Sequence, residues 1–214
     1  MIGAQAWVAS RARPALMPRR FREVSGVACL NKPRGDEDGH QIGLWTSTWL
    51  GDEAISDWVR WCVDEDFGLP DSRRLHVWLL DVCPDIGIYE IDGVADLDAL
   101  VARYGVPSPY PFQVGDGMFP YIDADRLTAE GVTGIHLTDR GRWATRHRYD
   151  APPGAPSLAG WDCESTLWLR WPGGTVRYLG PRVVPEREPY EWEETNPCAG
   201  LGDSMRRSSG EPPE

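Results

Sequence analysis

Cysteine and histidine are scarce and scattered in this sequence. The five cysteines are far apart, odd in number and never in a CxxC spacing, and the four histidines form no metal-ligand pattern with them. This distribution argues against a disulfide framework and against a structural zinc site, so we expect a protein that binds no metal. Widely spaced cysteines that form no disulfide framework are typical of proteins in the reducing cytoplasm.

Long apolar runs are missing as well. No stretch of the sequence approaches the roughly 18 apolar residues that a membrane-spanning helix needs. The first residues do not combine a charged region with an apolar run of signal-peptide length. We therefore expect a cytoplasmic protein that makes no contact with a membrane.

Lysine is almost absent, and negative charge predominates. Lys32 is the only lysine, and 33 acidic side chains against 22 basic ones give a formal net charge of −11. The basic side chains gather in residues 1–35, whereas residues 185–214 are acidic. An acidic body repels phosphate backbones, so we do not expect non-specific nucleic-acid binding. The basic N-terminal segment is suited to holding a phosphorylated small molecule.

The length of 214 residues is enough for one domain with a substantial core. We predict a single globular domain over residues 1–184. From residue 185 onward proline and glutamate dominate and apolar periodicity disappears. Residues 185–214 are therefore predicted to be an acidic, disordered tail.

Apolar periodicity predicts more strands than helices. Strands are predicted at residues 4–10, 44–48, 75–82, 86–91, 132–138, 142–148, 165–171 and 175–179. Helices are predicted at residues 53–67, 92–104 and 122–130, with Asp52 capping the first of them, and a further helical turn within 21–29. We expect 75–82 to lie beside 86–91, and 165–171 to form a hairpin with 175–179. Because no regular βαβ alternation is present, the predicted class is α+β, with a mostly antiparallel sheet flanked by two or three helices.

Tryptophan is abundant, with eleven residues, most of which we expect to pack in the core or on the sheet. Two tryptophan-framed clusters, at residues 43–49 and 161–171, place small hydroxyls or a carboxylate among large apolar side chains. Burying polar groups costs free energy unless they are hydrogen-bonded, and such placement is typical of a dry, pre-shaped site. We therefore expect a polar cleft between the strand at 44–48 and the strand that follows Glu164.

Four segments follow one another along the chain in an informative order. Arg11 comes after the first strand, Lys32-Pro33 follows, then the aromatic and hydroxyl residues of 45–48, and finally Glu164. This order resembles the Arg, Ser-Thr-Ser and Glu motifs of ADP-ribosyltransferases. The resemblance implies an ADP-ribosyltransferase-like fold, NAD as co-substrate, and mono-ADP-ribosyl transfer onto a macromolecular acceptor such as a protein.

The resemblance also implies a role for individual residues. The catalytic residues would be Glu164, which binds the ribose 2′-hydroxyl and stabilises an oxocarbenium-like transition state, and Ser47, which braces it. The NAD-binding residues would be Arg11, Lys32, Trp45 and Thr46. Of these, Arg11 would pair with the pyrophosphate, a task suited to a planar two-donor group. Lys32 or Arg34 is the alternative cation.

The chain departs from the family pattern just before Glu164. The family often has Glu or Gln two residues before its catalytic Glu, whereas this chain has Asp162. The acceptor preference is therefore left open by the sequence.

A second resemblance covers residues 30–171. The segments at 43–47, 134–138 and 161–165 look like those of a widespread family of uncharacterised phage and bacterial proteins. This likeness implies a compact domain but brings no activity with it. The alternative function is therefore a non-enzymatic phage or bacterial interaction protein that binds a host protein.

Other reactive side chains are assigned structural roles. Cys62 and Cys163 stand beside acids, which raise a thiol pKa and disfavour a nucleophile. His136 falls inside a predicted strand, where a structural histidine is favoured over a catalytic base.

Overall fold

The computed structural model describes residues 2–12, 16, 18, 21–30, 43–107, 120–146, 148, 152, 155–184 and 186. Its strands are β1 (Gln5–Ala9), β2 (Val27–Cys29), β3 (Leu44–Thr48), β4 (Arg74–Asp81), β5 (Ile88–Ile91), β6 (Gly105–Val106), β7 (Tyr121–Asp123), β8 (Gly134–Leu137), β9 (Ser165–Trp168) and β10 (Thr175–Val183). Its helices are α1 (Asp57–Asp64), α2 (Val94–Tyr104), α3 (Ala124–Ala129) and α4 (Asp139–Arg146).

The described strands form two sheets. The large one has seven strands in the order β10-β4-β1-β3-β9-β8-β5, and the small one has the order β2-β7-β6. Within the large sheet β5 and β8 run parallel, and every other neighbouring pair is antiparallel. The predicted α+β class with a mostly antiparallel sheet is confirmed.

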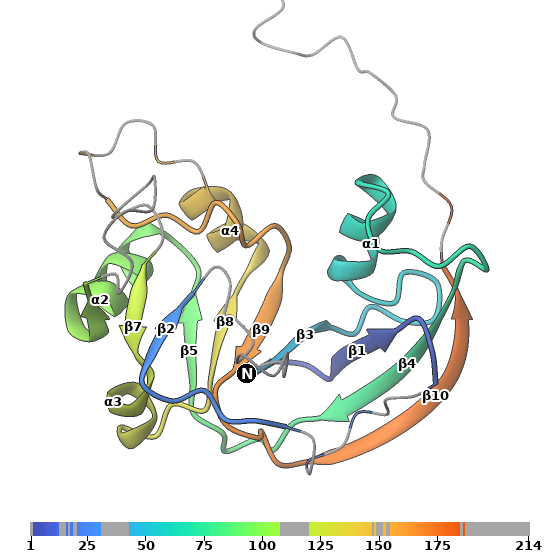
Figure 1. Cartoon of the computed structure of the whole chain (residues 1–214), viewed down its shortest axis with the longest axis horizontal. Helices are drawn as coiled ribbons and strands as arrows, with labels where there is room; N and C mark the ends of the chain where they lie inside the picture. Colours follow the sequence, from blue (N-terminus) through green and yellow to red (C-terminus); the bar gives the residue numbers. More distant parts are fainter. Residues whose placement is uncertain are drawn as a thin grey trace, which may run out of the picture.

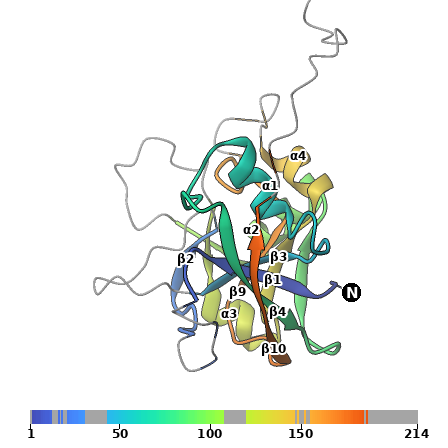
Figure 2. The same cartoon turned by 90° about the vertical axis from the view of Figure 1, so that its right-hand side faces the viewer.

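The large sheet is strongly curved (Figure 1). The small sheet, α2 and α3 lie beside its β5–β8 half, while β1, β4 and β10 make up the other half. In both views α1 and α4 lie at the same end of the molecule (Figures 1 and 2). That end holds the start of β9, and with it the candidate site.

Three apolar clusters hold these layers together. The first joins α2 and α3 to β8 and β9, with Leu97, Leu127 and Leu167 fully buried. The second packs Val59 of α1 against Val77 of β4. The third contains Leu44, Trp78, Leu80 and Trp168 and lies on the opposite face of the sheet, because side chains alternate along each strand.

Most tryptophans pack against the sheet, as expected. Trp78, Trp161 and Trp168 are buried. Five others, Trp7, Trp45, Trp49, Trp61 and Trp171, are half-buried. Trp58 and Trp143 are exposed, and Trp192 lies outside the described residues. The two exposed rings are both on helices at the end that holds the candidate site.

Two glycines permit close approaches that define the sheet's packing. A Cβ at Gly134 would lie 2.8 Å from the Trp168 ring, so the missing side chain makes room for that indole. A Cβ at Gly141 would lie 2.1 Å from the backbone oxygen of Ile91. A side chain at either position would force α4 or Trp168 away from the sheet.

Two strand pairings expected from the sequence are wrong. Strands β4 and β5 are close in sequence, but β1, β3, β9 and β8 lie between them in the sheet. Strands β9 and β10 do not form a hairpin, because β9 pairs with β3 and β8 while β10 pairs with β4. The short connections between β4 and β5 and between β9 and β10 led to the prediction that these strands are neighbours. Each instead pairs with strands that are distant in the sequence, where both faces of the sheet are covered.

Two element types also differ from the prediction. Residues 142–146 of the basic strand expected at 142–148 belong to α4 instead. The first turn of this helix is capped by Thr138, whose hydroxyl accepts from Gly141 N at 2.9 Å. The helical turn expected within 21–29 is replaced by β2, which pairs with β7 far along the chain. Helix α1 begins after Ser56 rather than Asp52, because Ser56 Oγ accepts from Val59 N.

Some expectations fall on residues that the structure does not describe. The proline-rich loop expected at 107–120 has only its two end residues described, and of the predicted tail at 185–214 only Glu186 is described. Among the helices that are described, none has the length and apolar character needed to cross a membrane.

Candidate functional site

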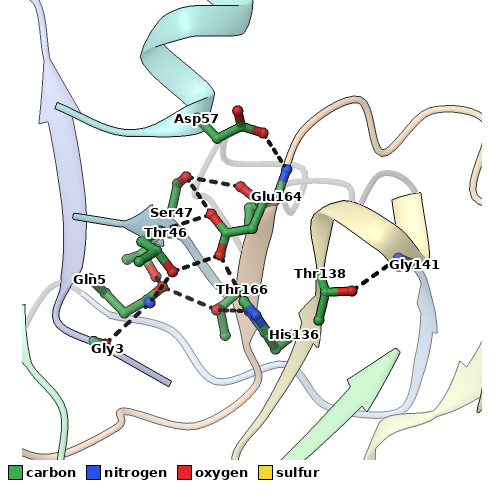
Figure 3. A network of polar contacts seen from close by, with 12 residues as sticks. Gly3, Gln5, Thr46, Ser47, Asp57, His136, Thr138, Gly141, Glu164 and Thr166 are labelled. Atoms are coloured by element: carbon green, nitrogen blue, oxygen red, sulfur yellow. Dashed lines mark hydrogen bonds and ion pairs between the residues drawn. The ribbon is translucent and has the colours of Figure 1, made fainter. Parts of the chain in front are cut away.

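The candidate site lies where β3, β9 and the first turn of α1 meet (Figure 3). Thr46 pairs with Thr166 in the β3–β9 register, so Ser47 and Thr48 come next to Glu164, just before β9. The backbone N–H of Glu164 donates to Asp57 Oδ2 of α1 at 2.8 Å. Strand β3 and helix α1, which are neighbours in the sequence, therefore position a glutamate that lies 107 residues beyond Asp57.

The Glu164 carboxylate accepts three hydrogen bonds from β3. Oε2 accepts from Thr48 N at 3.0 Å and from Ser47 Oγ at 2.9 Å, and Oε1 accepts from Thr48 Oγ1 at 2.8 Å. The single Ser47 hydroxyl hydrogen is shared between Oε2 and the Glu164 carbonyl oxygen, which is also 2.9 Å away. The side chain is 13% exposed. Because a carboxylate oxygen can accept two hydrogen bonds, Oε1 keeps capacity for one further donor. The glutamate is thus rigidly oriented and still able to accept a bond from a ligand hydroxyl.

Gln5 of β1 is the hub of the polar network behind Glu164. Its side chain is fully buried, and its Oε1 accepts from Thr46 Oγ1 at 2.9 Å and Thr166 Oγ1 at 3.1 Å. Its Nε2 donates to Thr48 Oγ1 at 3.2 Å, and Thr48 in turn donates to Glu164. The Gln5 amide therefore connects β1, β3 and β9, and it fixes the Thr48 hydroxyl that donates to the Glu164 carboxylate.

The direction of these bonds assigns the proton of His136. The single hydroxyl hydrogen of Thr166 is donated to Gln5, so His136 Nδ1, 3.0 Å from Thr166 Oγ1, must be the donor in that contact. Glu164 Oε1 lies 3.6 Å from the same nitrogen, which also favours a hydrogen there. The neutral ring then has Nε2 as its free acceptor.

Burial lowers the pKa of His136 below its ordinary range, and the neighbouring carboxylates of Glu164 and Glu90 oppose that shift only in part. The positive charge of the amino terminus lowers it further. The native state therefore holds His136 neutral, and the hydrogen-bond assignment above applies at neutral pH.

The lowered pKa predicts acid-sensitive stability. As pH falls below the ordinary histidine value of about 6.5, the unfolded chain takes up a proton at this position before the native state does. The contribution of His136 to the free energy of unfolding is thus complete above that pH and is lost as the pH drops through the native pKa. Urea unfolding at a series of pH values should show a shallower acid slope for His136→Asn than for the wild type. Equal slopes would contradict the assignment.

The predicted site residues divide into two groups. Ser47 and Glu164 are in contact, and Thr46 joins them through Gln5 and Thr48. Trp45 lies on the other face of β3 from Thr46, and its half-buried ring packs edge-on against Trp161, with ring centroids 4.6 Å apart.

Of the predicted cations, Arg11 is described and does not lie beside Glu164. Gln5 is at the end of β1 that is nearest the site, whereas Arg11 is exposed and follows the opposite end. At the usual strand rise, the span from Gln5 to Ala9 alone covers about 13 Å. Lys32 and Arg34 lie outside the described residues.

Two arginines of α4 contact the segment that leads to Glu164. Arg142 Nη1 donates to the Asp162 carbonyl at 2.9 Å, and Arg146 lies 3.1 Å from the Asp162 carboxylate. Arg142 also pairs with Asp139 at 2.6 Å. The two acids balance the two guanidinium charges, so this group anchors α4 to the site without adding net positive charge.

The cysteines near the site are poor nucleophiles. Burial raises the pKa of Cys62 to about 11. Burial and then the Asp57 carboxylate raise the pKa of Cys163 to about 12. In the ranges that the structure describes, no group of three or more histidine, cysteine, aspartate or glutamate side chains could hold a metal ion.

Sequence reasoning missed part of the network. Gln5 and His136 were not expected in the site, and Thr166 belonged to the predicted cluster at 161–171 without a role of its own, although each is buried and bonded within the network. A single polar residue in an otherwise apolar strand is the local indication at Gln5 and His136. Their convergence depends on the strand order, which no local pattern reveals.

Comparison with known proteins adds no relative. No family model matches the chain, and no curated protein or solved structure matches it. The function must therefore be argued from the geometry of the site.

Proposed function

We propose that the protein transfers a single ADP-ribosyl group from NAD to a macromolecular acceptor, with Glu164 as the catalytic residue. In this reaction the bond between nicotinamide and the ribose breaks, and nicotinamide leaves with the bonding electrons. A nucleophile of the acceptor then bonds to the ribose carbon and loses its proton. The carboxylate stabilises the positive charge that develops on the ribose between these events.

One observation carries the proposal: Glu164 is held by Ser47 and Thr48 with an acceptor position left on Oε1. A carboxylate that is already oriented pays no reorganisation cost when positive charge appears beside it. The free position on Oε1 suits a ribose hydroxyl. The contact between a hydroxyl-bearing strand and a later glutamate also fits the motif order noted in the sequence.

The pyrophosphate of NAD requires a positive charge that is not already neutralised, because the body of the protein is acidic. Arg142 and Arg146 are balanced by Asp139 and Asp162. We therefore keep the pyrophosphate role with the basic N-terminal segment, which contains Arg11, Lys32 and Arg34 in the sequence.

Nicotinamide release from NAD by the purified chain tests the proposal, with Ser47→Ala as the diagnostic variant. We expect this change to lower kcat about tenfold and to leave KM nearly unchanged, since Ser47 orients Glu164 rather than binding substrate. Ser25→Ala, at an exposed serine, is the matched control and should behave like the wild type. Absence of nicotinamide release from the wild type, with candidate acceptor proteins present, would refute the proposed activity.

A further inference from the structure

Helix α1 presents an aromatic surface to solvent beside the candidate site. Trp58 and Trp61 stack with ring centroids 5.1 Å apart and an interplanar angle of 23°. Phe67 closes the group, with its ring 5.2 Å from Trp61 and 6.3 Å from Trp58. We call these three residues the α1 aromatic surface.

This surface is not the side of α1 that packs on the protein. Val59, Cys62 and Val63 form the buried side of the helix. Trp58 is 37% exposed and Phe67 is 54% exposed, which leaves large apolar area in water. Clustered exposed aromatics are typical of an interaction site rather than of an ordinary protein surface.

The charge around the α1 aromatic surface is strongly negative. Between residues 52 and 66 the chain has six acids, and Arg60 is the only base in this segment. One of the six, Asp52, is paired with Arg182 of β10 at 2.6 Å, and the remaining acids still outnumber Arg60. Asp64, Glu65 and Asp66 are exposed, and Glu65 follows Trp58 and Trp61 at helical spacing on the same side of α1. Nucleic acid would be repelled here, whereas a cation would be attracted by both the acids and the ring faces.

We propose that the α1 aromatic surface binds an arginine-bearing basic segment of a partner protein. The guanidinium plane stacks on the exposed indole and phenyl rings, and the flanking acids supply the complementary charge. Arginine is favoured over lysine, because its planar and weakly hydrated group can stack and still donate hydrogen bonds to carboxylates.

The α1 aromatic surface lies close to the residues that position Glu164. Asp57 accepts the backbone N–H of Glu164, and the N–H of Trp58 donates to Ser47 Oγ at 3.4 Å. A partner on α1 is therefore presented next to Glu164. We assign this bound partner as the acceptor of the ADP-ribosyl group. Only this assignment rests on the proposed function; binding of the partner to α1 does not.

Titration of the full chain with Gly-Arg, Gly-Lys and Gly-Gln repeat peptides of equal length, without NAD, tests the surface. We expect the Gly-Arg peptide to bind tightest and the Gly-Gln peptide not to bind. Trp58→Ala and Phe67→Ala should each weaken Gly-Arg binding about tenfold. Trp143→Ala is the matched control, because Trp143 is 63% exposed on α4 and lies outside this surface. Glu65→Gln keeps every ring and should reduce both the affinity and its salt dependence.

Several results would overturn the surface assignment. Equal weakening by Trp143→Ala would show that the loss of affinity is not specific to the α1 aromatic surface. Unchanged affinity in Phe67→Ala and Glu65→Gln, both at exposed positions and with melting temperatures like the wild type, would show that the peptide binds elsewhere on the protein. Self-association of the wild type that is lost in Trp58→Ala would identify a second copy as the occupant. Peptide binding without nicotinamide release would keep the surface and refute the proposed activity, and the converse would refute the surface alone.

Discussion

Replacing Glu164 with glutamine is expected to lower the rate of nicotinamide release about a hundredfold, equivalent to about 3 kcal/mol of lost transition-state stabilisation. The variant removes the negative charge that would face the ribose cation while keeping the shape of the side chain. The amide oxygen can still occupy the Oε2 position and accept from Ser47 and Thr48 N. The amide nitrogen then takes the Oε1 position, where it cannot accept from Thr48 Oγ1 or from a ribose hydroxyl. The rate loss should therefore appear mainly in kcat, with a smaller loss of NAD affinity.

The comparison with Glu90→Gln makes this result specific. Glu90 pairs with His136 in the β5–β8 register, so its replacement also removes a carboxylate near the network. It makes none of the contacts that hold the Glu164 side chain and should retain wild-type turnover. Undiminished nicotinamide release by Glu164→Gln, with NAD turnover established for the wild type, would remove Glu164 from the chemistry.

Gln5→Met is expected to destabilise the protein by about 2–4 kcal/mol, which is large for one substitution. Methionine fills a similar volume, but it offers no acceptor to the hydroxyls of Thr46 and Thr166 and no donor to Thr48. The hydroxyls of Thr46 and Thr166 are buried, so each is left without an acceptor for its hydrogen, whereas half-buried Thr48 loses one donor. Urea unfolding at neutral pH measures the difference in the free energy of unfolding.

A double-mutant cycle with Thr166→Val separates the hydrogen bond from general disruption. Because Gln5 and Thr166 share one bond, the double variant should lose less stability than the sum of the two single variants, by about 1 kcal/mol. Thr175→Val, at an exposed position of β10, should add independently to Gln5→Met. Strict additivity in both pairs would show that Gln5 contributes through packing alone.

Local sequence patterns predicted three of the four described helices and many strands, because the information that specifies these elements is local. The apolar spacing of Val59, Leu97 and Leu127 reflects the buried sides of α1, α2 and α3. The strand at 44–48 was predicted with its observed bounds. The α4 region was misjudged, because its short buried side consists of Gly141 and Thr145, which give no apolar periodicity.

Strand partners could not be predicted from the same patterns. The predicted neighbours β4 and β5 are separated by four strands, since pairing is decided by which faces must be buried together. The contact of Ser47 with Glu164 was expected only through the resemblance to a motif order. The participation of Gln5 and His136 depends on the positions of β1 and β8 in the sheet, which follow from the whole topology.

The central position of β1 in the large sheet constrains the order in which the protein folds during synthesis. Gln5 leaves the ribosome before its partner Thr166, which is 161 residues further along the chain. At usual synthesis rates of about 5–20 residues per second, Gln5 waits roughly 10–30 s for that partner. Strand β3 can shield β1 on one edge and β4 on the other during this interval, while the Gln5 amide still lacks its partner on β9. Assembly of the carboxylate site is therefore a late folding event. A nascent or truncated chain that ends before Glu164 already contains the donors of β3 and the Asp57 acceptor of α1, but not the carboxylate that they position.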